Sequence, residues 1–368
     1  MNYLRRLPLR PAAYAALTAL FALALVAPSL SPAAHAQLSA PKAPAGPNGK
    51  IVFESDQAGD QEGINDIYTM DADGRHQTRL TTDAAHDGSA VWSPDGTKIA
   101  FISNRRGTFE IYLMNADGSN QRPLRAEGVQ TFDSVEWSPD GTRLAYVNGG
   151  EACVVEAVAP GGGDSVVAPW SVSTGRLLGS SDIGVSWSPD GTRLVVRNAE
   201  SCGGCSDLYA VNADGTGRVK LSTGVGFDTE PRWSPDGTRV AYEGDRNGRA
   251  IYVTNADGTG TETLLSGAVG SFGGPEWSPD GTRLAFSSDL GVIHVVNADG
   301  TGLTALNEQT LTGSRGPFWS PDGKQVAFQE SGDIFVVNAD GTSRRASNYT
   351  KTRRATEFAG SWQRIVTP

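Results

Sequence analysis

Short runs of apolar residues recur along this chain, and turn-forming residues bound each of them. In one unit, Leu284, Ala285 and Phe286 form an unbroken apolar run, a second run follows at 292–296, and a mixed polar segment follows at 303–306. An unbroken apolar run predicts a strand covered on both faces, and a mixed segment predicts a strand at an edge. The tetrapeptides at 278–281 (Ser-Pro-Asp-Gly) and 297–300 (Asn-Ala-Asp-Gly) suit tight turns between such strands.

The sequence Trp-Ser-Pro-Asp-Gly marks a repeat along most of the chain. Its six copies begin at Trp92, Trp137, Trp187, Trp233, Trp277 and Trp319, and a degenerate copy surrounds Trp362. The steps between these tryptophans are 45, 50, 46, 44, 42 and 43 residues. A period of this length, built from short strands, indicates a four-stranded antiparallel unit repeated around a ring. We therefore predict an all-β fold, a β-propeller.

The first and last repeats are incomplete in complementary ways. Residues 50–82 contain three predicted strands without a tryptophan-bearing strand before them, whereas residues 359–366 contain only the tryptophan-bearing strand. We predict that the C-terminal strand completes the first blade and closes a ring of seven blades, with six blades as the alternative. Closure would leave no unpaired inner edge.

These repeats resemble the TolB-type β-propellers of bacterial envelope proteins, which are distantly similar to WD-repeat propellers. The resemblance covers roughly residues 50–366 and rests on the six Trp-Ser-Pro-Asp-Gly copies and on turns that begin at Asp71, Asn115, Asn212, Asn255, Asn297 and Asn338. It implies a propeller that works in the cell envelope; TolB itself has six blades. The short segment before the first repeat does not match the N-terminal α/β domain of TolB, which argues against a role as the Tol-system component.

The first 36 residues predict a secretory signal peptide. A basic start precedes an apolar run at 12–27, and a small-residue cleavage site ends at Ala36. The run is too short for a comfortable membrane span, so no stable membrane insertion is expected. Residues 37–49, rich in Pro, Ala and Gly, predict a flexible linker, and residues 50–368 the propeller domain. We expect the mature protein to be periplasmic or secreted, and monomeric.

Charge argues against one class of partner, and the cysteines indicate a disulfide. The formal net charge is −10, which opposes binding to nucleic acid. An oxidising compartment favours a disulfide among Cys153, Cys202 and Cys205. Cys202 with Cys205 is the favoured pair, and a bridge from Cys153 to either of them is the alternative.

The loops divide into a constant class and a variable class. The two tight turns of each unit hardly change, whereas the loops between the second and third strands, and those between blades, vary in sequence. Loops without a packing role commonly carry binding residues, so we expect the binding face on their side of the ring. The charged residues expected to surround the channel mouth there are Asp87, Asp133, Glu136, Asp182, Asp228, Glu230, Arg232, Glu276 and Arg315. This mostly acidic ring suits a basic peptide or a cation, and a solvated channel mouth is the alternative.

Catalytic motifs find little support. There is no Gly-x-Ser-x-Gly sequence, and His86, flanked by Asp83 and Asp87, is the one histidine of the mature chain near a variable loop. The Asp-Ala-Asp-Gly turn at Asp71 lacks the later acidic ligands of a calcium loop, so neither a metal nor a cofactor is expected. We predict a rigid protein- or peptide-binding scaffold rather than an enzyme. The alternative is a hydrolase or lyase acting on envelope or extracellular polymers, which would require acidic side chains to converge with His86 at the channel mouth.

Overall fold

The fold was analysed in a computed structural model of the chain. It describes residues 48–56, 64–124, 135–148, 151–157, 170–172, 184–198, 205–222, 226–246, 248–260, 263–266, 274–288, 290–308, 314–342, 347–348 and 358–364. All of these residues belong to one compact unit, Ser39–Pro368. Within the described ranges, no helix is long and apolar enough to cross a membrane.

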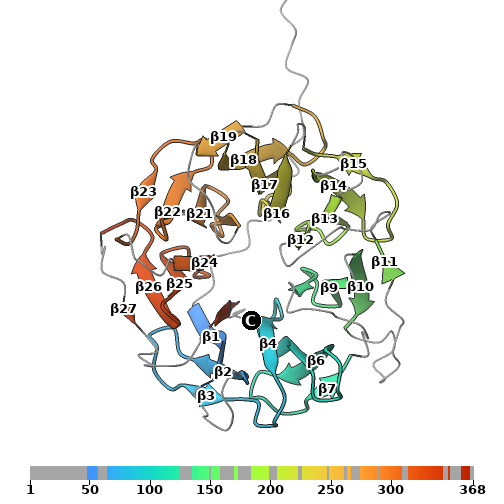
Figure 1. Cartoon of the computed structure of the whole chain (residues 1–368), viewed down its shortest axis with the longest axis vertical. Coiled ribbons are helices and arrows are strands. Elements are labelled where there is room, and N and C mark those ends of the chain that lie inside the picture. Colours follow the sequence, from blue (N-terminus) through green and yellow to red (C-terminus); the bar gives the residue numbers. More distant parts are fainter. Residues whose placement is uncertain are drawn as a thin grey trace, which may run out of the picture. The chain divides into compact units, whose positions relative to one another are not determined.

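Seven four-stranded antiparallel sheets form the blades of a β-propeller (Figure 1). Blade 1 has the strand order β28-β1-β2-β3, and blades 2 to 7 follow in chain order. The C-terminal strand therefore completes the first blade, which confirms the prediction of seven blades closed by that strand.

Each blade runs from an innermost strand to an outer edge. The innermost strands are β28 (Phe358–Arg364), β4 (Asp87–Trp92), β8 (Glu136–Trp137), β12 (Val185–Trp187), β16 (Phe227–Trp233), β20 (Glu276–Trp277) and β24 (Ser314–Trp319). The second strands are β1 (Asn48–Ser55), β5 (Lys98–Ser103), β9 (Arg143–Asn148), β13 (Arg193–Asn198), β17 (Arg239–Asp245), β21 (Arg283–Ser287) and β25 (Gln325–Glu330). The third strands are β2 (Asp66–Met70), β6 (Glu110–Asn115), β10 (Glu151–Glu156), β14 (Asp207–Asn212), β18 (Arg249–Asn255), β22 (Ile293–Asn297) and β26 (Asp333–Asn338). The outer strands are β3 (Thr78–Arg79), β7 (Arg122–Pro123), β11 (Trp170–Ser171), β15 (Val219–Lys220), β19 (Thr263–Ser266), β23 (Thr304–Ala305) and β27 (Ser347–Asn348).

The core is divided among the junctions between blades. Seven clusters of buried apolar side chains lie one at each junction, including that between blades 7 and 1. The second strand of each blade contributes side chains to the clusters on both of its faces. In β21, for example, Leu284, Ala285 and Phe286 all have no exposed surface. Burial of apolar area is the main favourable term in folding, so each blade depends on its two neighbours.

The Ser-Pro-Asp-Gly turns satisfy their own polar groups. In the first copy, Ser93 Oγ donates to Asp95 Oδ1 at 2.6 Å, and Asp95 Oδ1 accepts the Thr97 main-chain N–H at 3.0 Å. Gly96 has φ +69°, a conformation that glycine adopts without strain. The same Ser–Asp bond recurs in the other five copies. The aspartates of the repeat are thus turn residues.

Each repeat tryptophan packs against the preceding blade. In four of the seven, the indole Nε1–H donates to the main-chain carbonyl of the residue that precedes the tryptophan of that blade, as from Trp187 to Glu136 at 3.3 Å and from Trp319 to Glu276 at 2.9 Å. Trp137 and Trp277 make the same bond. This bond sets the distance between neighbouring inner strands.

At two junctions between blades, a main-chain N–H makes the polar bond in place of the indole. The indole N–H groups of Trp92 and Trp233 find no acceptor among the described residues. In both cases the preceding blade carries serine directly before its tryptophan, and Ser361 and Ser186 accept the main-chain N–H of Trp92 and Trp233 instead. The packing between inner strands therefore tolerates different residues at this position.

A second set of contacts bridges consecutive blades. Arg143 stacks over Trp187 of the next blade, with its guanidinium carbon 4.7 Å from the ring centroid, and its Nη2 donates to the Gly191 carbonyl at 2.8 Å. Arg193, Arg239 and Arg283 stack on the next tryptophan in the same way. Stacking adds a cation–π term to the hydrogen bond.

At the closing blade, Gln363 of β28 replaces this arginine contact. Its Nε2 donates to the Gly96 carbonyl of blade 2 at 2.8 Å, and its Oε1 accepts the Lys50 main-chain N–H at 3.0 Å. The side chain fits because glycines face it; a Cβ built at Gly49 would lie 2.8 Å from Gln363 Cβ. Gln363 thereby ties the C-terminal strand to two blades at once.

We predict that Gln363→Ala destabilises the propeller by about 1–3 kcal/mol, because it leaves a main-chain N–H and a carbonyl unpaired. Chemical denaturation would measure the change. Arg364→Ala is the matched control, since the Arg364 side chain makes no hydrogen bond within the described part of the chain. Equal stability of the two variants would contradict the role of Gln363.

Candidate functional site

The residue before each repeat tryptophan occupies the same place on every innermost strand. Its carbonyl takes part in blade packing, but its side chain differs from blade to blade. In blades 1 to 7 these residues are Ser361, Val91, Glu136, Ser186, Arg232, Glu276 and Phe318. The charged side chains thus fall on blades 3, 5 and 6, while blades 2 and 7 carry apolar ones.

Arg232 forms the centre of a charged group on these strands. Its Nε lies 2.7 Å from Glu276 Oε1, and its Nη2 lies 3.6 Å from Glu230 Oε2. Solvent reaches 24% of the Arg232 side chain, 25% of Glu230 and 34% of Glu276. We call Glu136, Glu230, Arg232 and Glu276 the axial cluster.

Glu136 contributes a carboxylate with an unusual proton affinity. Its Oε1 accepts the Trp187 main-chain N–H at 3.2 Å. Burial raises the pKa of Glu136 to about 7, although the positive charge of Arg232 and the Trp187 bond act in the opposite direction and the charge of Glu276 adds to the rise. Glu136 makes no ion pair with any described residue.

The carboxylates in turn act on Arg232. Burial by itself would lower the pKa of Arg232, but the charges of Glu276, Glu230 and Glu136 outweigh it and raise the pKa above its usual value. Arg232 is therefore permanently protonated, though enclosed by protein on most sides. One guanidinium faces three carboxylates, which leaves an excess of negative charge that a bound cation could balance.

Glu230 occupies space that glycines leave open. It lies in a bulge of β16 with φ +49°, a backbone conformation rare outside glycine. A Cβ built at Gly274 would lie 2.3 Å from Glu230 Cβ, and one at Gly184 would lie 3.1 Å from Glu230 Cα. Blades 4, 5 and 6 therefore approach each other closely because two of the three carry glycine there.

Two other predicted site residues are buried between blades. Asp87 is fully covered and pairs with Arg105 Nη2 at 3.0 Å, and Arg105 also lies 2.9 Å from Asp83. Asp228 is 3% exposed and lies 3.5 Å from Arg246 Nη2. Both arginines also stack on tyrosine rings of their own blades. These carboxylates pair with arginines of their own blades and are not accessible to a ligand.

The remaining predicted residues are described in part or not at all. Asp133, Asp182 and Cys202 lie outside the described residues. The Arg315 main chain pairs with Gln329 in blade 7, but its side chain is not described. Cys205 is disulfide-bonded and Cys153 is a free, buried thiol. The pairing of Cys202 with Cys205 stays a prediction.

Sequence reasoning missed a second buried carboxylate near this end of the blades. Glu54, in β1, accepts a hydrogen bond from Asn65 Nδ2 at 3.5 Å and another from the Ser89 main chain. Burial nevertheless raises the pKa of Glu54 to about 7. The one available signal was a charged residue in an otherwise apolar strand, Ile51-Val52-Phe53-Glu54.

These observations define the class of protein: a seven-bladed β-propeller with a charged cluster on its inner strands. The sequence matches the TolB beta propeller domain family over residues 30–167 and 178–267, more than half of the chain. The chain therefore belongs to this family.

Solved structures with the same fold have different functions. TolB from Acinetobacter baumannii aligns with a TM-score of 0.51 and 17% identity over 86% of this chain, which spans 66% of that protein. An oligogalacturonate lyase in complex with manganese aligns with a TM-score of 0.58 and 16% identity, covering 82% of this chain and 85% of the lyase. A puromycin-hydrolyzing peptidase of Mycobacterium tuberculosis aligns with a TM-score of 0.57 and 14% identity, covering 78% of this chain and 50% of the peptidase. At such identities the likeness concerns the fold alone.

We predict that Glu54 and Glu136 make a contribution to the free energy of unfolding that falls as pH rises from about 4.5 to 7. Burial raises the pKa of Glu54 and Glu136 from 4.5 to about 7 in the folded state, so the folded protein binds more protons than the unfolded chain in this window. The stabilisation is complete below pH 4.5 and lost above pH 7. Glu54→Gln with Glu136→Gln should remove most of this slope in denaturation curves taken between pH 5 and 8.

Asp299→Asn serves as the control for this measurement. Asp299 is exposed, and hydrogen bonds from Thr301 lower its pKa, so it titrates below the window. An unchanged slope in the double glutamine variant would show that the two glutamates titrate normally.

We also predict that Gly274→Ala costs about 1–3 kcal/mol of stability, the usual effect of overfilling a packed site. Glu230→Gly in the same chain should restore part of the loss, because it removes the Cβ that the added methyl group would meet. The same change should not rescue Gly49→Ala, whose Cβ would meet Gln363 instead. A rescue of both, or of neither, in denaturation experiments would contradict the contact.

Proposed function

We propose that this protein is an exported binding scaffold that holds a basic segment of another envelope protein at the axial cluster. The observation that carries the proposal is the group of three carboxylates around one guanidinium, on inner strands that solvent reaches. Ligand binding by a rigid ring costs little conformational entropy on the scaffold side.

The electrostatics favour a cationic side chain as the ligand. Of the two carboxylates that pair with Arg232, Glu276 is the more exposed. Glu136 has no ion pair with any described residue. A lysine or arginine head could pair with these two groups. The equivalent positions of blades 2 and 7 carry Val91 and Phe318, both partly buried, and the apolar stem of a long basic side chain suits such neighbours.

The location follows from separate lines of support. The N-terminal segment has the features of a secretory signal, and Cys205 is disulfide-bonded, as is usual outside the cytosol. The family and the TolB structure with the same fold point to the cell envelope as the compartment.

A propeller hydrolase or lyase is the alternative, and the surroundings of His86 count against it. Asp83 and Asp87 both pair with Arg105, although the charge of Asp87 also acts on His86 and raises its pKa. The His86 ring accepts the Asn65 main-chain N–H at Nδ1, 3.3 Å away, and burial lowers the pKa of His86. Among the described residues, no three His, Cys, Asp or Glu side chains are grouped to hold a metal ion. These observations favour the scaffold.

We predict that a fluorescently labelled tri-lysine peptide binds the wild-type protein and that Glu136→Gln with Glu276→Gln weakens its affinity roughly tenfold or more. Loss of two charge-assisted contacts accounts for about 1.4 kcal/mol at least. Fluorescence anisotropy at low ionic strength would measure both affinities. The wild-type affinity should also rise between pH 6 and 8 as Glu136 ionises.

Asp117→Asn with Asp299→Asn is the charge-matched control, because both aspartates lie on exposed turns between the third and outer strands of their blades. If this pair of changes weakened the affinity for tri-lysine equally, the effect would come from net charge and not from the axial cluster. Tighter binding of tri-glutamate than of tri-lysine would overturn the proposed function.

A further inference from the structure

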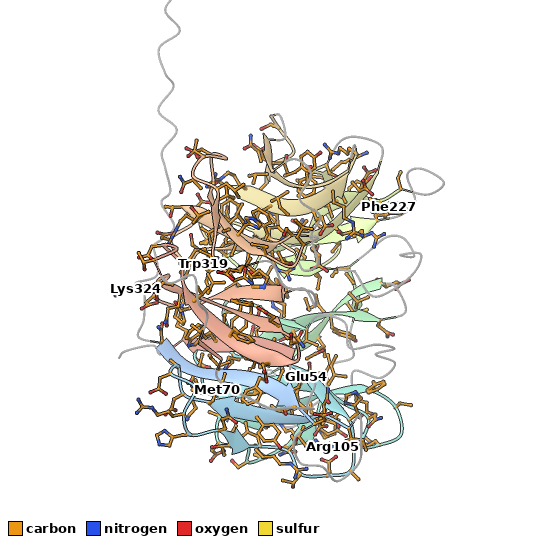
Figure 2. The ribbon with its side chains drawn as sticks, turned by 60° about the vertical axis from the view of Figure 1, so that its left-hand side comes forward. Glu54, Met70, Arg105, Phe227, Trp319 and Lys324 are labelled. Atoms are coloured by element: carbon orange, nitrogen blue, oxygen red, sulfur yellow. The ribbon has the colours of Figure 1, made fainter. Side chains whose placement is uncertain are left out.

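Phe227 is an exposed aromatic residue at the start of β16, the strand that carries two residues of the axial cluster, Glu230 and Arg232. Among the described residues, four large apolar side chains are exposed, and Phe227, at 48%, is the one aromatic ring in this group. Val219 lies in outer strand β15 and Leu303 directly before β23, whereas Phe227 begins β16, which also holds Glu230 and Arg232. Phe227 lies at one side of the ribbon, and Lys324, which follows a Ser-Pro-Asp-Gly turn, lies at the other side (Figure 2).

The main chain at Phe227 is held firmly by the neighbouring blade. The residue pairs with Asp245 in its own blade and forms a parallel bridge to Ser206 of blade 4. Ser206 donates its N–H to the Gly226 carbonyl at 3.0 Å, and its carbonyl accepts the Asp228 N–H at 3.2 Å. A side chain with two rotatable bonds on such a backbone loses little freedom when a partner covers it.

The fold itself does not need an aromatic residue at this place. The equivalent residue of blade 2, also six positions before the tryptophan, is His86, whose ring accepts the Asn65 N–H. In blade 5 the corresponding N–H, that of Ser206, is already bonded to a carbonyl. Phe227 is part of none of the seven core clusters that the described residues form.

We propose that Phe227 and the axial cluster are two contact points of one docking site for an extended protein segment that carries an apolar side chain and a basic side chain. The inference rests on the proposed function, since the basic side chain is the one expected at the cluster. Exposed aromatic residues on rigid backbones are typical anchors of protein interfaces.

The strand itself sets the spacing between the two contacts. Phe227 and Arg232 are five residues apart, which corresponds to at most roughly 16 Å along a strand, and the bulge at Glu230 shortens this distance. A partner in extended conformation would therefore present its apolar and basic side chains about four or five residues apart. The cluster supplies charge complementarity and Phe227 supplies the apolar contact.

Two synthetic hexapeptides test this surface on the full mature protein. The first has phenylalanine at one end and lysine at the other with four glycines between them, and the second has glycine in place of the phenylalanine. We expect the first to bind at least about threefold more tightly in calorimetry or anisotropy. Phe227→Ser should abolish the difference and leave the affinity for the second peptide unchanged.

Leu303→Ser is the matched control, since Leu303 is 51% exposed and lies on blade 6 away from β16. It should alter neither affinity, and thermal denaturation should find both serine variants as stable as the wild type. Equal affinity of the two peptides for the wild type would overturn the role of Phe227 while the proposed function stands. Binding of polygalacturonate oligomers but of neither peptide would overturn both.

Discussion

The packing of each repeat tryptophan against the blade before it is the interaction on which the rest of the structure depends. The indole N–H of Trp137, Trp187, Trp277 and Trp319 binds a main-chain carbonyl, not a side chain. Inner strands are therefore held at a constant distance whatever residue supplies the carbonyl. The backbone of one position per blade is thus fixed while its side chain can vary, and three of the four residues of the axial cluster, Glu136, Arg232 and Glu276, lie at this position.

Two members of the axial cluster, Glu136 and Glu230, carry a local cost to stability, which argues for a role other than folding. Burial raises the pKa of Glu136 to about 7, so near neutral pH the folded state holds a carboxylate that it disfavours. Glu230 adds a left-handed backbone and needs glycine at 184 and 274, just before the neighbouring strands β12 and β20. Uncompensated charge and strain commonly gather where a protein binds its ligand, because there the partner supplies the missing interactions.

Sequence reasoning predicted the fold almost completely and the site in part, for physical reasons. Seven blades and their closure followed from the spacing of the tryptophans, since turn and packing residues repeat with the blades. Glu136, Arg232 and Glu276 directly precede a tryptophan, so their register was visible in the sequence. Asp87 and Asp228 lie beyond a bulge, at Ser89 and Glu230, and the bulge rather than strand alternation directs them into buried positions beside arginines of their own blades. Glu54 was missed because its burial depends on the neighbouring blade.

The distribution of inter-blade contacts places the cluster on the firmer part of the ring. Arginines that stack on the next tryptophan bridge the junctions from blade 3 through blade 7. The equivalent positions of blades 1, 2 and 7 hold Lys50, Lys98 and Gln325, and at the closing blade Gln363 provides the bridge. The cluster residues lie on blades 3, 5 and 6, within the arginine-bridged arc. Fraying of the C-terminal strand, the natural weak point of a ring closed by its two ends, would therefore leave the charged strands in place.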